Sequence, residues 1–578
     1  MSKNLIALQN RFLGNEKTAY GLLSARRRQR GKISTEDIDQ LAADHHLPAQ
    51  LLRSTAEFYD ELKPQAASAA THHLQVCNGE ACRAAGSDDV KQQLVSHFAD
   101  RLAGKLEIGD VTCLGYCSSG PNLWLDQQPL SIASRDIKKT IDHYLATAAN
   151  NFEPPQNNCY LPADDAPAVL MPYLQRGDQV TAGLYQQLKT ALADYSPEQL
   201  LAQIRISELR GRGGAGFPLA TKLQTVRNSG NGVENESQKK YLVVNFDEGD
   251  AGAYIDKELV ERCPALLLCG ALLAAHACGA SSIYIYARLE YPEARRRLAD
   301  AVQQLSSKQM IGDRIAGSEY SCDITIIEGQ GAYICGEETS LLRSIEGLPA
   351  TVSIRPPFPA EQGLWGRPTA VCNVETLCNL PWIVEHGGKR YAKFGHEKSR
   401  GTKLVSLNTR VKRPGLYEVE LGTTLRQIIF DLAGGMADGE IFKAVQIGGP
   451  LGGILPASAL DTPLAFESLQ QVGGILGHGG MVIYSENDDL AKIARGVMAF
   501  CGRESCGKCF PCRIGSVRAT ELLDQISESG ATPERLELLT DICDTMKAGS
   551  LCAMGSMTPA AVESVLTHFP TELGQGER

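Results

Sequence analysis

At 578 residues the chain is long enough for roughly three to five domains. Its hydrophobic share of 43% and charged share of 21% are typical of a folded globular protein and exclude a fibrous or largely disordered one. The net charge of -10 argues against binding to nucleic acid, which depends on clustered positive charge.

The first residues, MSKNLIALQNRF, lack the continuous apolar segment of a signal peptide. The longest apolar stretch, Pro264–Cys278, is too short to cross a bilayer. The sequence therefore predicts a cytoplasmic protein with no direct membrane insertion. The 18 cysteines then favour metal binding over disulfide bonds, because the cytosol keeps thiols reduced.

Helical periodicity at the start of the chain predicts a small helical domain over residues 1–70. Ser34–Asp37, followed by the apolar Ile38, has the pattern of a capping box at a helix start. The basic run Arg26–Arg30 is interpreted as the solvated end of a helix, with docking onto a partner subunit as the alternative.

Short strand-like runs (LQVC, LEIGDVTC and LWLD) and a helical stretch at Asp88–Leu106 predict a compact α/β domain over residues 71–148. The Asn- and Pro-rich residues 149–164 are expected to form a linker. Over residues 165–400, apolar strands such as YLVVNF and SSIYIYARL alternate with helical stretches, which predicts a parallel sheet covered by helices. The largest site is expected in this domain.

Residues 401–486 are rich in strands, with a helix expected at Thr424–Leu432, and predict a β-grasp-like domain. Residues 487–578 are again helical and contain a cluster of cysteines. The predicted fold class is therefore a multidomain α/β protein with helical domains at both ends of the chain.

Two cysteine pairs lie in the predicted α/β domain, Cys77-x4-Cys82 and Cys113-x3-Cys117. Each pair follows a predicted strand, so two loops can bring four thiolates together, two for each iron of a [2Fe-2S] cluster. A structural zinc site is the alternative, because zinc-binding cysteine pairs have about two to four residues between them.

A second cysteine pattern lies near the C-terminus, where Cys506, Cys509 and Cys512 form a C-x2-C-x2-C run and Cys552 follows at a distance. A tight loop that offers three sulfurs, completed by a remote fourth, predicts a [4Fe-4S] cluster, with zinc again the alternative. Cys501 and Cys543 do not fit the spacing and are interpreted as ordinary buried thiols.

The segment Arg210–Pro218 contains a literal G-x-G-x-x-G at Gly211, Gly213 and Gly216. Glycines permit close approach of the backbone to a phosphate, and Lys222 lies where a following helix would start. An ordinary dinucleotide-binding fold has an apolar strand before this motif, whereas Leu200–Leu209 has helical periodicity. The sequence therefore disfavours a plain Rossmann fold.

Five motifs follow one another in the order and approximate spacing of one family: ELRGRGGAGFP from Glu208, NFDEGD from Asn245, GAYICGEET from Gly331, RPPFP from Arg355 and ESCGKCFPC from Glu504. In these motifs the chain resembles the FMN- and NADH-binding subunit of respiratory NADH dehydrogenase. The preceding helical and cysteine-pair domains resemble the small thioredoxin-like subunit of that enzyme, here fused in front. The resemblance covers nearly the whole chain.

This resemblance implies a Rossmann-like FMN- and NADH-binding domain, one [4Fe-4S] cluster and one [2Fe-2S] cluster. By the same resemblance, the flavin phosphate is bound by Gly211, Arg212, Gly213, Gly214 and Lys222. The ribityl chain and ring edge are held by Asn245, Asp247 and Glu248, and the flavin and nicotinamide are bordered by Tyr333, Gly336, Glu337 and Glu338. Phe217 and Phe358 would stack on the adenine of NADH. The carboxylates favour NADH over NADPH, because their charge opposes an additional 2'-phosphate.

Three positions depart from the family pattern. The family usually has Glu where this chain has Asp250, an aromatic residue where it has Thr225, and Asn-Asn where it has Cys372–Asn373. Asp250 and Asn373 are retained as expected cofactor contacts. A change in nucleotide affinity and a neutral substitution both remain open for each position.

The implied function is that of an NADH:acceptor oxidoreductase (diaphorase) subunit, in which hydride passes from NADH to FMN and single electrons pass on to the [4Fe-4S] cluster. No catalytic acid or base is expected. The segment Gly449–Ser458 looks most like the β subunit of soluble NAD-dependent formate dehydrogenases. The expected partner is the catalytic subunit of a formate dehydrogenase or a hydrogenase with further iron-sulfur clusters, and the input module of an NADH-quinone oxidoreductase is the alternative. A zinc-stabilised scaffold and a stand-alone flavin reductase are the competing classes.

Overall fold

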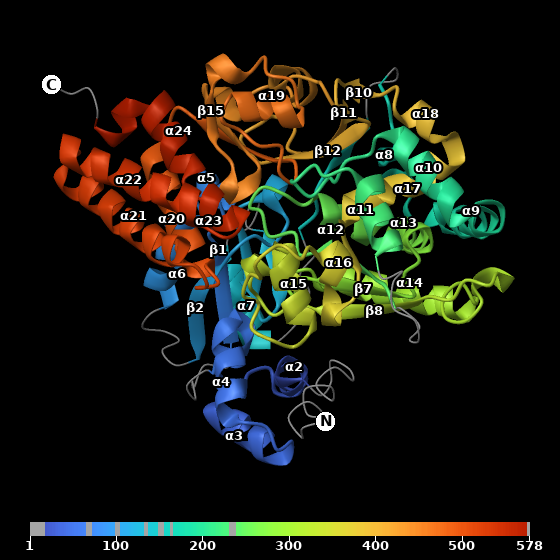
Figure 1. Cartoon of the computed structure of the whole chain (residues 1–578). Helices are drawn as coiled ribbons and strands as arrows, with labels where there is room; N and C mark the ends of the chain where they lie inside the picture. Colours follow the sequence, from blue (N-terminus) through green and yellow to red (C-terminus); the bar gives the residue numbers. More distant parts are fainter. Residues whose placement is uncertain are drawn as a thin grey trace.

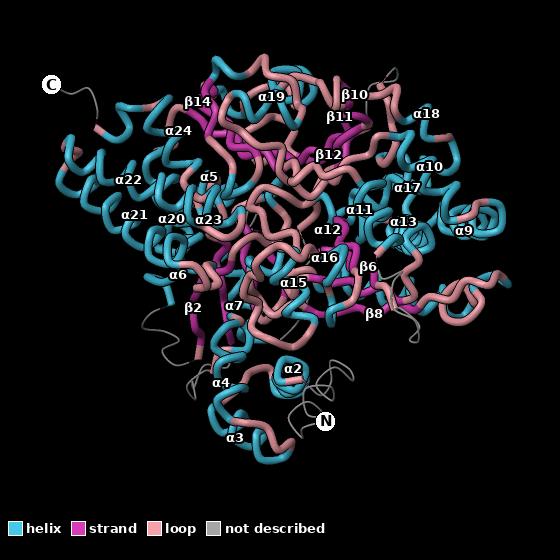
Figure 2. The backbone as a smooth tube through the Cα atoms, viewed as in Figure 1, coloured by secondary structure: helices cyan, strands magenta, loops and turns pink. Residues whose placement is uncertain are grey.

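The computed structural model describes residues 18–64, 72–98, 105–131, 137–147, 155–161, 166–229 and 239–574. Figure 1 shows the N-terminal helices at the bottom of the view, the β-grasp-like region at the top and the C-terminal helices at the upper left. Strands and helices are mixed through the middle of the molecule (Figure 2). The multidomain α/β class is confirmed.

A four-stranded parallel sheet forms the centre of the molecule. Its strands are β6 (Tyr241–Phe246), β7 (Ser282–Ala287), β8 (Asp323–Glu328) and β9 (Thr369–Asn373), in the order β8-β7-β6-β9. Alternate residues of β6 enter different cores: Leu242 and Val244 pack on one face of the sheet and Val243 on the other. Both faces are therefore buried, as expected for a parallel sheet.

Helix α13 (Pro264–Cys278) packs on one face of this sheet together with α9 (Thr181–Asp194) and α17 (Val374–His386). It is apolar all round, and all of its residues except His276 are buried, as is typical of a helix enclosed by others. This layer also contains α8 (Met171–Arg176), α10 (Pro197–Ser207), α11 (Leu219–Asn228), α12 (Ile255–Arg262) and α14 (Pro292–Ser307). Within the described ranges no single helix is long and apolar enough to span a bilayer; α12 and α13 pass by length and composition only as a pair bent by 102°.

The opposite face of the sheet is covered by α2 (Ala19–Arg30), α3 (Thr35–Asp44) and α4 (Ala49–Phe58), whose apolar residues share a core with Val243. The predicted capping box is confirmed, with Ser34 and Asp37 bonded reciprocally at the start of α3. The basic run forms ion pairs within this helical region: Arg26 and Arg30 with Asp37, and the buried Arg27 with Glu61.

The thioredoxin-like domain has a mixed sheet in the order β2-β1-β3-β4, formed by β1 (His72–Cys77), β2 (Leu106–Val111), β3 (Asn122–Leu125) and β4 (Gln128–Ser131). Strand β1 is parallel to β2 and antiparallel to β3. The accompanying helices are α5 (Glu80–Ala84), α6 (Ser87–Phe98) and α7 (Ile137–Thr147). The three predicted strand-like runs correspond to β1, β2 and β3.

The β-grasp-like region contains a six-stranded sheet in the order β15-β14-β16-β12-β13-β5. Two residues of the segment expected to be a linker, Cys159 and Tyr160, form its edge strand β5 and pair with β13. The expected helix at Thr424–Leu432 is present as a π-helix over Gln427–Leu432. The other strands are β12 (Thr402–Leu407), β13 (Gly415–Glu420), β14 (Phe442–Ile447), β15 (Ile454–Pro456) and β16 (Gly480–Ser485), and the sheet is accompanied by α19 (Phe466–Gln471).

The C-terminal region is helical, as predicted. Helices α20 (Leu490–Glu504), α21 (Phe510–Ser529) and α22 (Pro533–Gly549) pack side by side and are followed by α23 (Ala553–Met557) and α24 (Ala560–His568). Gly507, at φ +74°, lies in the turn between α20 and α21. This turn contains the first cysteines of the C-x2-C-x2-C run.

Candidate functional site

The strand order of the central sheet creates a crevice for a ligand. The chain leaves β6 for β7 on one side and returns to β9 on the other, so the carboxyl ends of β6 and β9 flank a topological switch point. Ligands of open α/β sheets bind at such points. Asn245 of β6 and Asn373 of β9, both predicted site residues, are partners in the register of these two strands.

The glycine-rich loop lies beside this crevice and connects α10 to α11, so a helix and not a strand precedes it, as expected. The Gly211 N–H donates to the Phe217 carbonyl over 2.9 Å and closes the loop. A Cβ on Gly213 would lie 2.9 Å from the Cβ of Asn373, too close for any larger residue. Gly214 has a φ of +118°, which only glycine adopts without strain. These glycines therefore let the loop pass close to Asn373.

The two cations predicted to bind phosphate are in different environments. Arg212 is fully buried and donates from Nη2 to the Arg400 carbonyl over 2.6 Å and to the Tyr391 hydroxyl over 3.0 Å. Lys222 is partly exposed, donates to the Val371 carbonyl over 2.8 Å and lies 3.8 Å from Glu338. The structure thus places the Lys222 side chain at an accessible edge of the loop, whereas the Arg212 side chain anchors the loop from inside.

The acidic loop after β6 faces the turn that contains Gly336. The Asn245 side chain donates from Nδ2 to the Gly336 carbonyl over 2.8 Å, and its Oδ1 accepts from the Asp247 N–H over 3.2 Å. Within the described part of the chain, the buried Oδ2 of Asp247 accepts no hydrogen bond. Burial raises the pKa of Asp247 well above its usual range, although Arg288 opposes this shift. A buried acceptor without a donor suits a ligand that carries hydroxyl groups.

Glu248 points away from the crevice. Its carboxylate accepts the N–H groups of the first three residues of α12 at 2.7–3.0 Å, and it is 2% exposed. Burial acts to raise the pKa of Glu248, but His478 and these donors hold it below its usual range. The resemblance indicates a Glu248 contact with the flavin; in the structure this side chain caps a helix, so only the backbone of Glu248 is available to the crevice.

Tyr333 connects the crevice to the C-terminal helices. Its hydroxyl donates to Asp250 over 2.7 Å, and its N–H donates to the Glu504 carboxylate over 2.8 Å. Glu504 is the last residue of α20 and comes directly before the cysteine run. The predicted flavin region and the predicted [4Fe-4S] region are therefore in direct contact.

Glu337 and Glu338 lie at the start of α15 (Glu338–Ile345). One oxygen of Glu337 caps the helix by accepting from Thr339 and Ser340 at 2.9 Å, and its buried Oε1 accepts no hydrogen bond from any residue that the structure describes. Glu338 pairs with Arg355 at 2.7 Å. Glu337 thus offers a second free acceptor beside the Gly336 turn.

The two predicted adenine-stacking residues are exposed, Phe217 by 50% and Phe358 by 52%. Each ring lies just before a helix, α11 and α16 (Pro359–Gln362), and these helices pack against each other. Exposed aromatic rings on neighbouring helices are suited to stacking on a base.

The three departures from the family pattern occupy different environments. Asp250 still reaches the Tyr333 hydroxyl with its shorter side chain. Thr225 lies on α11 and donates to the Thr221 carbonyl over 2.9 Å. Cys372 lies in the main core, where burial raises the pKa of its thiol to about 11. Its side chain therefore packs into the protein and not into the crevice.

The first four cysteines meet as two pairs in a buried interior. Cys113 Sγ and Cys117 Sγ lie 3.8 Å apart, and all four thiols are at most 3% exposed. A hydrogen bond from Cys82, supported by backbone N–H groups, lowers the pKa of Cys77 to about 7. A thiolate is therefore favoured at this position, as a metal ligand requires.

These cysteine loops rest directly on the segment that follows the acidic loop. A Cβ on Gly79 would lie 3.0 Å from the Ala251 side chain, and Cys113 Sγ lies 3.9 Å from the Ala253 carbonyl. The Lys257 ammonium lies 3.8 Å from the centre of the Tyr116 ring. The predicted [2Fe-2S] site is thus packed against the predicted flavin domain.

The second set of cysteines also comes together. Cys506 and Cys509 are half-buried, Cys512 and Cys552 are buried, and the Ser505 hydroxyl lies 3.2 Å from Cys512 Sγ. Burial, with a further contribution from the charge of Glu337, raises the pKa of Cys552 to about 11. Glu337 is therefore near both the crevice and this cysteine set.

Sulfur spacing separates the cluster and zinc alternatives. One tetrahedral zinc with Zn–S bonds of about 2.3 Å would hold its sulfurs about 3.8 Å apart. Among the described residues, the only group of three or more metal-ligating side chains with all ligand atoms within 4.8 Å of one another is Glu248, Asp256 and His478. Neither cysteine set is that compact, so both fit a multi-iron cluster better than a single ion.

Residues of the β-grasp-like region complete the crevice and were not predicted from the sequence. A Cβ on Gly214 would lie 3.5 Å from Gly477, and a Cβ on Gly449 would lie 2.5 Å from the Asp250 carboxylate carbon. The adjacent His478 forms ion pairs with Asp256 and Glu248. The signal that could have found them is the density of glycine in residues 448–453 and 473–480, because glycine allows backbones to approach closely.

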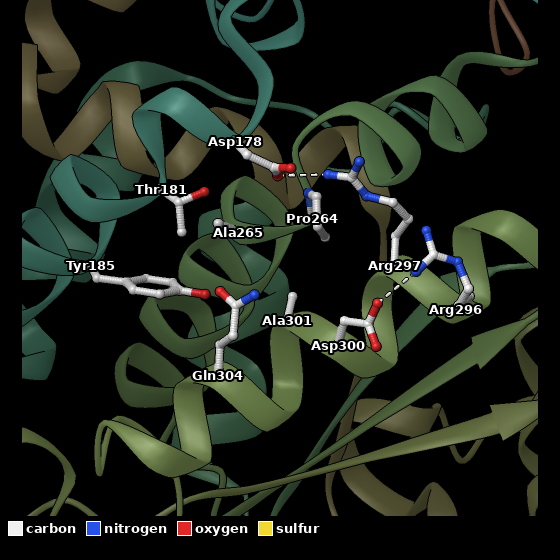
Figure 3. Close-up of a pocket in the computed structure, with 10 residues that line it drawn as sticks. All are labelled: Asp178, Thr181, Tyr185, Pro264, Ala265, Arg296, Arg297, Asp300, Ala301 and Gln304. Atoms are coloured by element: carbon white, nitrogen blue, oxygen red, sulfur yellow. Dashed lines mark hydrogen bonds and ion pairs between the residues drawn. The ribbon is translucent and has the colours of Figure 1, made fainter.

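A surface cavity of about 200 Å³ lies elsewhere, between α9, the start of α13 and α14 (Figure 3). Its charged residues pair with each other, Arg297 with Asp178 at 2.6 Å and Arg296 with Asp300 at 2.8 Å. None of the predicted site residues lines it.

Three family models match the chain. They are the Nuo51 FMN-binding domain at residues 204–382, the NADH-ubiquinone oxidoreductase-F iron-sulfur binding region at residues 492–576, and the thioredoxin-like [2Fe-2S] ferredoxin at residues 7–145. The chain thus carries an FMN-binding domain, a [4Fe-4S] region and a thioredoxin-like [2Fe-2S] domain.

Similar proteins are known in several organisms. The HndC subunit of the NADP-reducing hydrogenase of Solidesulfovibrio fructosivorans is 38% identical over 395 residues, which cover 68% of this chain and 79% of that protein. The NuoF-type (F) polypeptide of NADH-quinone oxidoreductase from Escherichia coli (strain K12) is 37% identical over 394 residues, covering 68% and 87%. A chain of the NAD⁺-reducing [NiFe]-hydrogenase in its air-oxidized state aligns with a TM-score of 0.83 and 28% identity, over 97% of this chain and 94% of that one. This chain is an oxidoreductase subunit and belongs to the family of the F polypeptide of NADH-quinone oxidoreductase.

Proposed function

We propose that this chain is a diaphorase subunit that exchanges electrons between NAD(H) and a partner subunit by means of FMN, a [4Fe-4S] cluster and a [2Fe-2S] cluster. One observation carries the proposal: the three loops with flavin motifs meet at the switch point, and Tyr333 joins them to Glu504 beside the cysteine run. A hydride carries two electrons whereas a cluster accepts one, and FMN supplies the conversion between them when bound.

The residues of the crevice have separable roles in this proposal. Lys222 and the backbone of Gly213 and Gly214 hold the flavin phosphate. The free oxygens of Asp247 and Glu337 accept hydrogen bonds from ribityl or ribose hydroxyls. These residues bind and orient the cofactors, and none has to transfer a proton as a general acid or base.

The nucleotide-binding roles follow from exposure and charge. Phe217 and Phe358 provide exposed rings for the adenine. Glu337 and Glu338 place negative charge beside the crevice, which disfavours a 2'-phosphate and makes NADH the preferred nucleotide.

Loss of the accessible lysine tests the flavin site. We expect Lys222→Ala to weaken FMN binding by about ten- to a hundredfold, because a charge-assisted hydrogen bond contributes about 1.5–3 kcal/mol. Quenching of FMN fluorescence in the purified apoprotein measures the dissociation constant. Lys189→Ala removes an exposed lysine of α9 and is the matched control. Unchanged FMN affinity in the Lys222 variant would contradict the assignment.

Loss of one cysteine separates a stand-alone flavin reductase from a diaphorase subunit. We expect Cys506→Ser to retain NADH-dependent reduction of the bound flavin but to lose electron transfer to the partner. Stopped-flow absorbance follows the first reaction, and NAD(H)-linked turnover of the purified complex follows the second. Cys543→Ser, a buried thiol outside the pattern, should retain both activities. Unimpaired transfer to the partner in the Cys506 variant would favour the reductase. Zinc in place of iron and sulfide in the purified protein would favour the scaffold.

For the partner, we propose the catalytic subunit of a soluble NAD-dependent formate dehydrogenase. The support is the segment Gly449–Ser458, which looks most like the β subunit of those enzymes and lies against Asp250 in the crevice. A hydrogenase is the second candidate, supported by the alignment over 97% of this chain with the NAD⁺-reducing [NiFe]-hydrogenase chain. The input module of an NADH-quinone oxidoreductase is the third.

The metal of the purified complex distinguishes these partners. We expect molybdenum or tungsten, together with formate-dependent reduction of NAD⁺. Nickel and hydrogen-dependent reduction would identify the hydrogenase instead. A membrane complex with neither activity would identify the quinone-linked module.

A further inference from the structure

The β-grasp-like region contributes one charged side chain to the interior behind the crevice. His478 lies in the loop between α19 and β16 and is 8% exposed. Its Nε2 lies 3.0 Å from Asp256 Oδ2 and 3.2 Å from Glu248 Oε1. Neither FMN nor either cluster requires a histidine at this position by any motif in the sequence.

The imidazole itself is the cation that these two carboxylates need. Glu248 already accepts three backbone N–H groups from α12. Asp256 accepts from the Asn373 side chain over 2.6 Å and from the Glu375 N–H over 3.1 Å. Since these oxygens already have donors, a metal ion would have to displace them. A protonated imidazole balances the charge without doing so.

The two carboxylates lead to opposite walls of the crevice. Asp256 holds the Asn373 amide, and the Cβ of Asn373 limits the space at Gly213 of the glycine-rich loop. Glu248 belongs to the acidic loop that also contains Asp247 and Asp250. His478 is therefore the common partner of both walls.

The loop that carries His478 is held in place on its other side. Gly477 packs against Gly214, and the buried Lys403 ammonium donates to the His478 carbonyl over 2.8 Å. The imidazole thus approaches the two carboxylates from a fixed backbone and from a different domain.

We propose that His478, in its protonated form, is a positioning residue that clamps the glycine-rich and acidic walls of the flavin crevice together. The proposal rests on the proposed FMN site and deepens it. His478 touches neither the cofactor phosphate nor the nucleotide in this assignment, and it acts through Asp256 and Glu248.

The clamp should depend on pH with a defined sign. Burial lowers the pKa of His478, but the two carboxylates outweigh burial and raise it well above the usual value. The clamp is therefore complete at low and neutral pH and is lost as the pH rises through this raised pKa. Asp250 and Glu375 add negative charge nearby, whereas Lys403 and Arg288 add positive charge.

The test compares His478→Gln with the wild-type chain, measuring the FMN dissociation constant from pH 6 to pH 10. We expect the variant to bind FMN at least about tenfold more weakly at neutral pH, as for loss of one charge-assisted contact. The wild-type chain should lose affinity toward high pH, and the variant should lose this component. His276→Gln, which replaces a half-buried histidine at the end of α13, is the matched control and should leave the profile unchanged.

A second variant keeps the test decisive if His478→Gln does not fold. Asp256→Asn leaves His478 with one carboxylate, so the alkaline loss of FMN affinity should shift to lower pH. In the double variant His478→Gln/Asp256→Asn, the loss of affinity should be smaller than the product of the two single losses, because no carboxylate is left without its cation. If both variants bind FMN with the wild-type affinity and pH profile, the clamp is wrong while the flavin site stands. If the wild-type chain itself does not bind FMN, the proposed function fails first.

Discussion

Among single residues, the buried pair of Lys403 and Glu375 is the largest unpaired-charge hazard near the crevice. Both side chains are fully buried, and Lys403 donates to Glu375, to the Leu404 carbonyl over 3.0 Å and to the His478 carbonyl over 2.8 Å. Burial lowers the pKa of Lys403, and Glu375 opposes this shift. All three ammonium protons have acceptors, so the charge is tolerated only while its partners remain.

Removal of one member of this pair should therefore be costly. We expect Lys403→Met to lower the free energy of unfolding by about 3–5 kcal/mol, because it leaves the Glu375 carboxylate buried without a cation. The double variant Lys403→Met/Glu375→Gln should be less destabilised than the single one. Thermal unfolding of the apoprotein measures both. An equal loss from Lys189→Met, at an exposed site, would show that the effect is not due to burial.

Individual residues also show the limit of motif reading. The motifs located the crevice correctly enough to bring Asn245, Gly336 and Asn373 to one switch point. They did not indicate that the side chains of Arg212 and Glu248 would turn inward. A motif marks a position in the chain, whereas the choice between backbone and side chain contact depends on the packing of distant segments such as Arg400 and α12.

Among the elements, the contact of α13 with α17 shows how glycine positions the layer beneath the sheet. A Cβ on Gly270 would lie 2.0 Å from the Leu377 carbonyl oxygen of α17. Because this obstacle is backbone, neither a rotamer change nor a small shift can relieve it. Gly270 therefore sets the distance between the two helices.

A matched pair of glycine substitutions tests this contact. We expect Gly270→Ala to destabilise the apoprotein by at least about 2 kcal/mol, since overpacking a core costs 1–3 kcal/mol and α17 cannot yield. Gly183→Ala, in α9, has no atom within 4 Å of the new Cβ and should stabilise by up to about 1 kcal/mol through helix propensity. Denaturant unfolding followed by circular dichroism gives both values. A neutral Gly270 variant would mean that the helices can separate.

The elements that the sequence predicted are those with strong periodicity or a defined start. The apolar strand YLVVNF became β6, and the capping box became the start of α3. The two-residue strand β5 has too few residues to show a period, and its pairing with β13 is fixed by a distant segment. The π-helix at Gln427–Leu432 has the composition of an α-helix, so sequence alone could not distinguish it.

At the level of the whole molecule, the cysteine loops of the thioredoxin-like domain lie where three regions meet. Gly79 packs on Ala251 of the flavin domain, and a Cβ on Gly496 of α20 would clash with the Arg83 guanidinium. The charge of Glu80, on α5, influences the pKa of Tyr484 in the β-grasp-like region. Figure 1 shows α5 among the C-terminal helices. The order of the domains follows from the motifs, but this mutual docking depends on surface shapes that no motif encodes.

The outer surface beside the second cysteine set carries an apolar stripe. On α21, Phe510 is 67% exposed, Ile514 is 36% exposed and Val517 is 45% exposed. Their spacing places them on one side of the helix. Leu551, next to Cys552, is 41% exposed. Since Cys506 and Cys509 are only half-buried, this stripe borders the part of the site that is nearest to solvent.

We expect this stripe to dock the partner subunit that exchanges electrons with the [4Fe-4S] site, because exposed apolar side chains in a group mark interaction surfaces. Val517→Asp should reduce NAD(H)-linked turnover of the complex at least about tenfold while leaving NADH-driven reduction of an artificial dye unchanged. A charge in an apolar contact opposes docking, whereas the dye needs no docking surface. Ser527→Asp adds the same charge to an exposed position further along α21 and should leave both rates intact. If Val517→Asp lowers dye reduction as strongly as complex turnover, the substitution damages the electron path within the chain, and the stripe is not the docking surface.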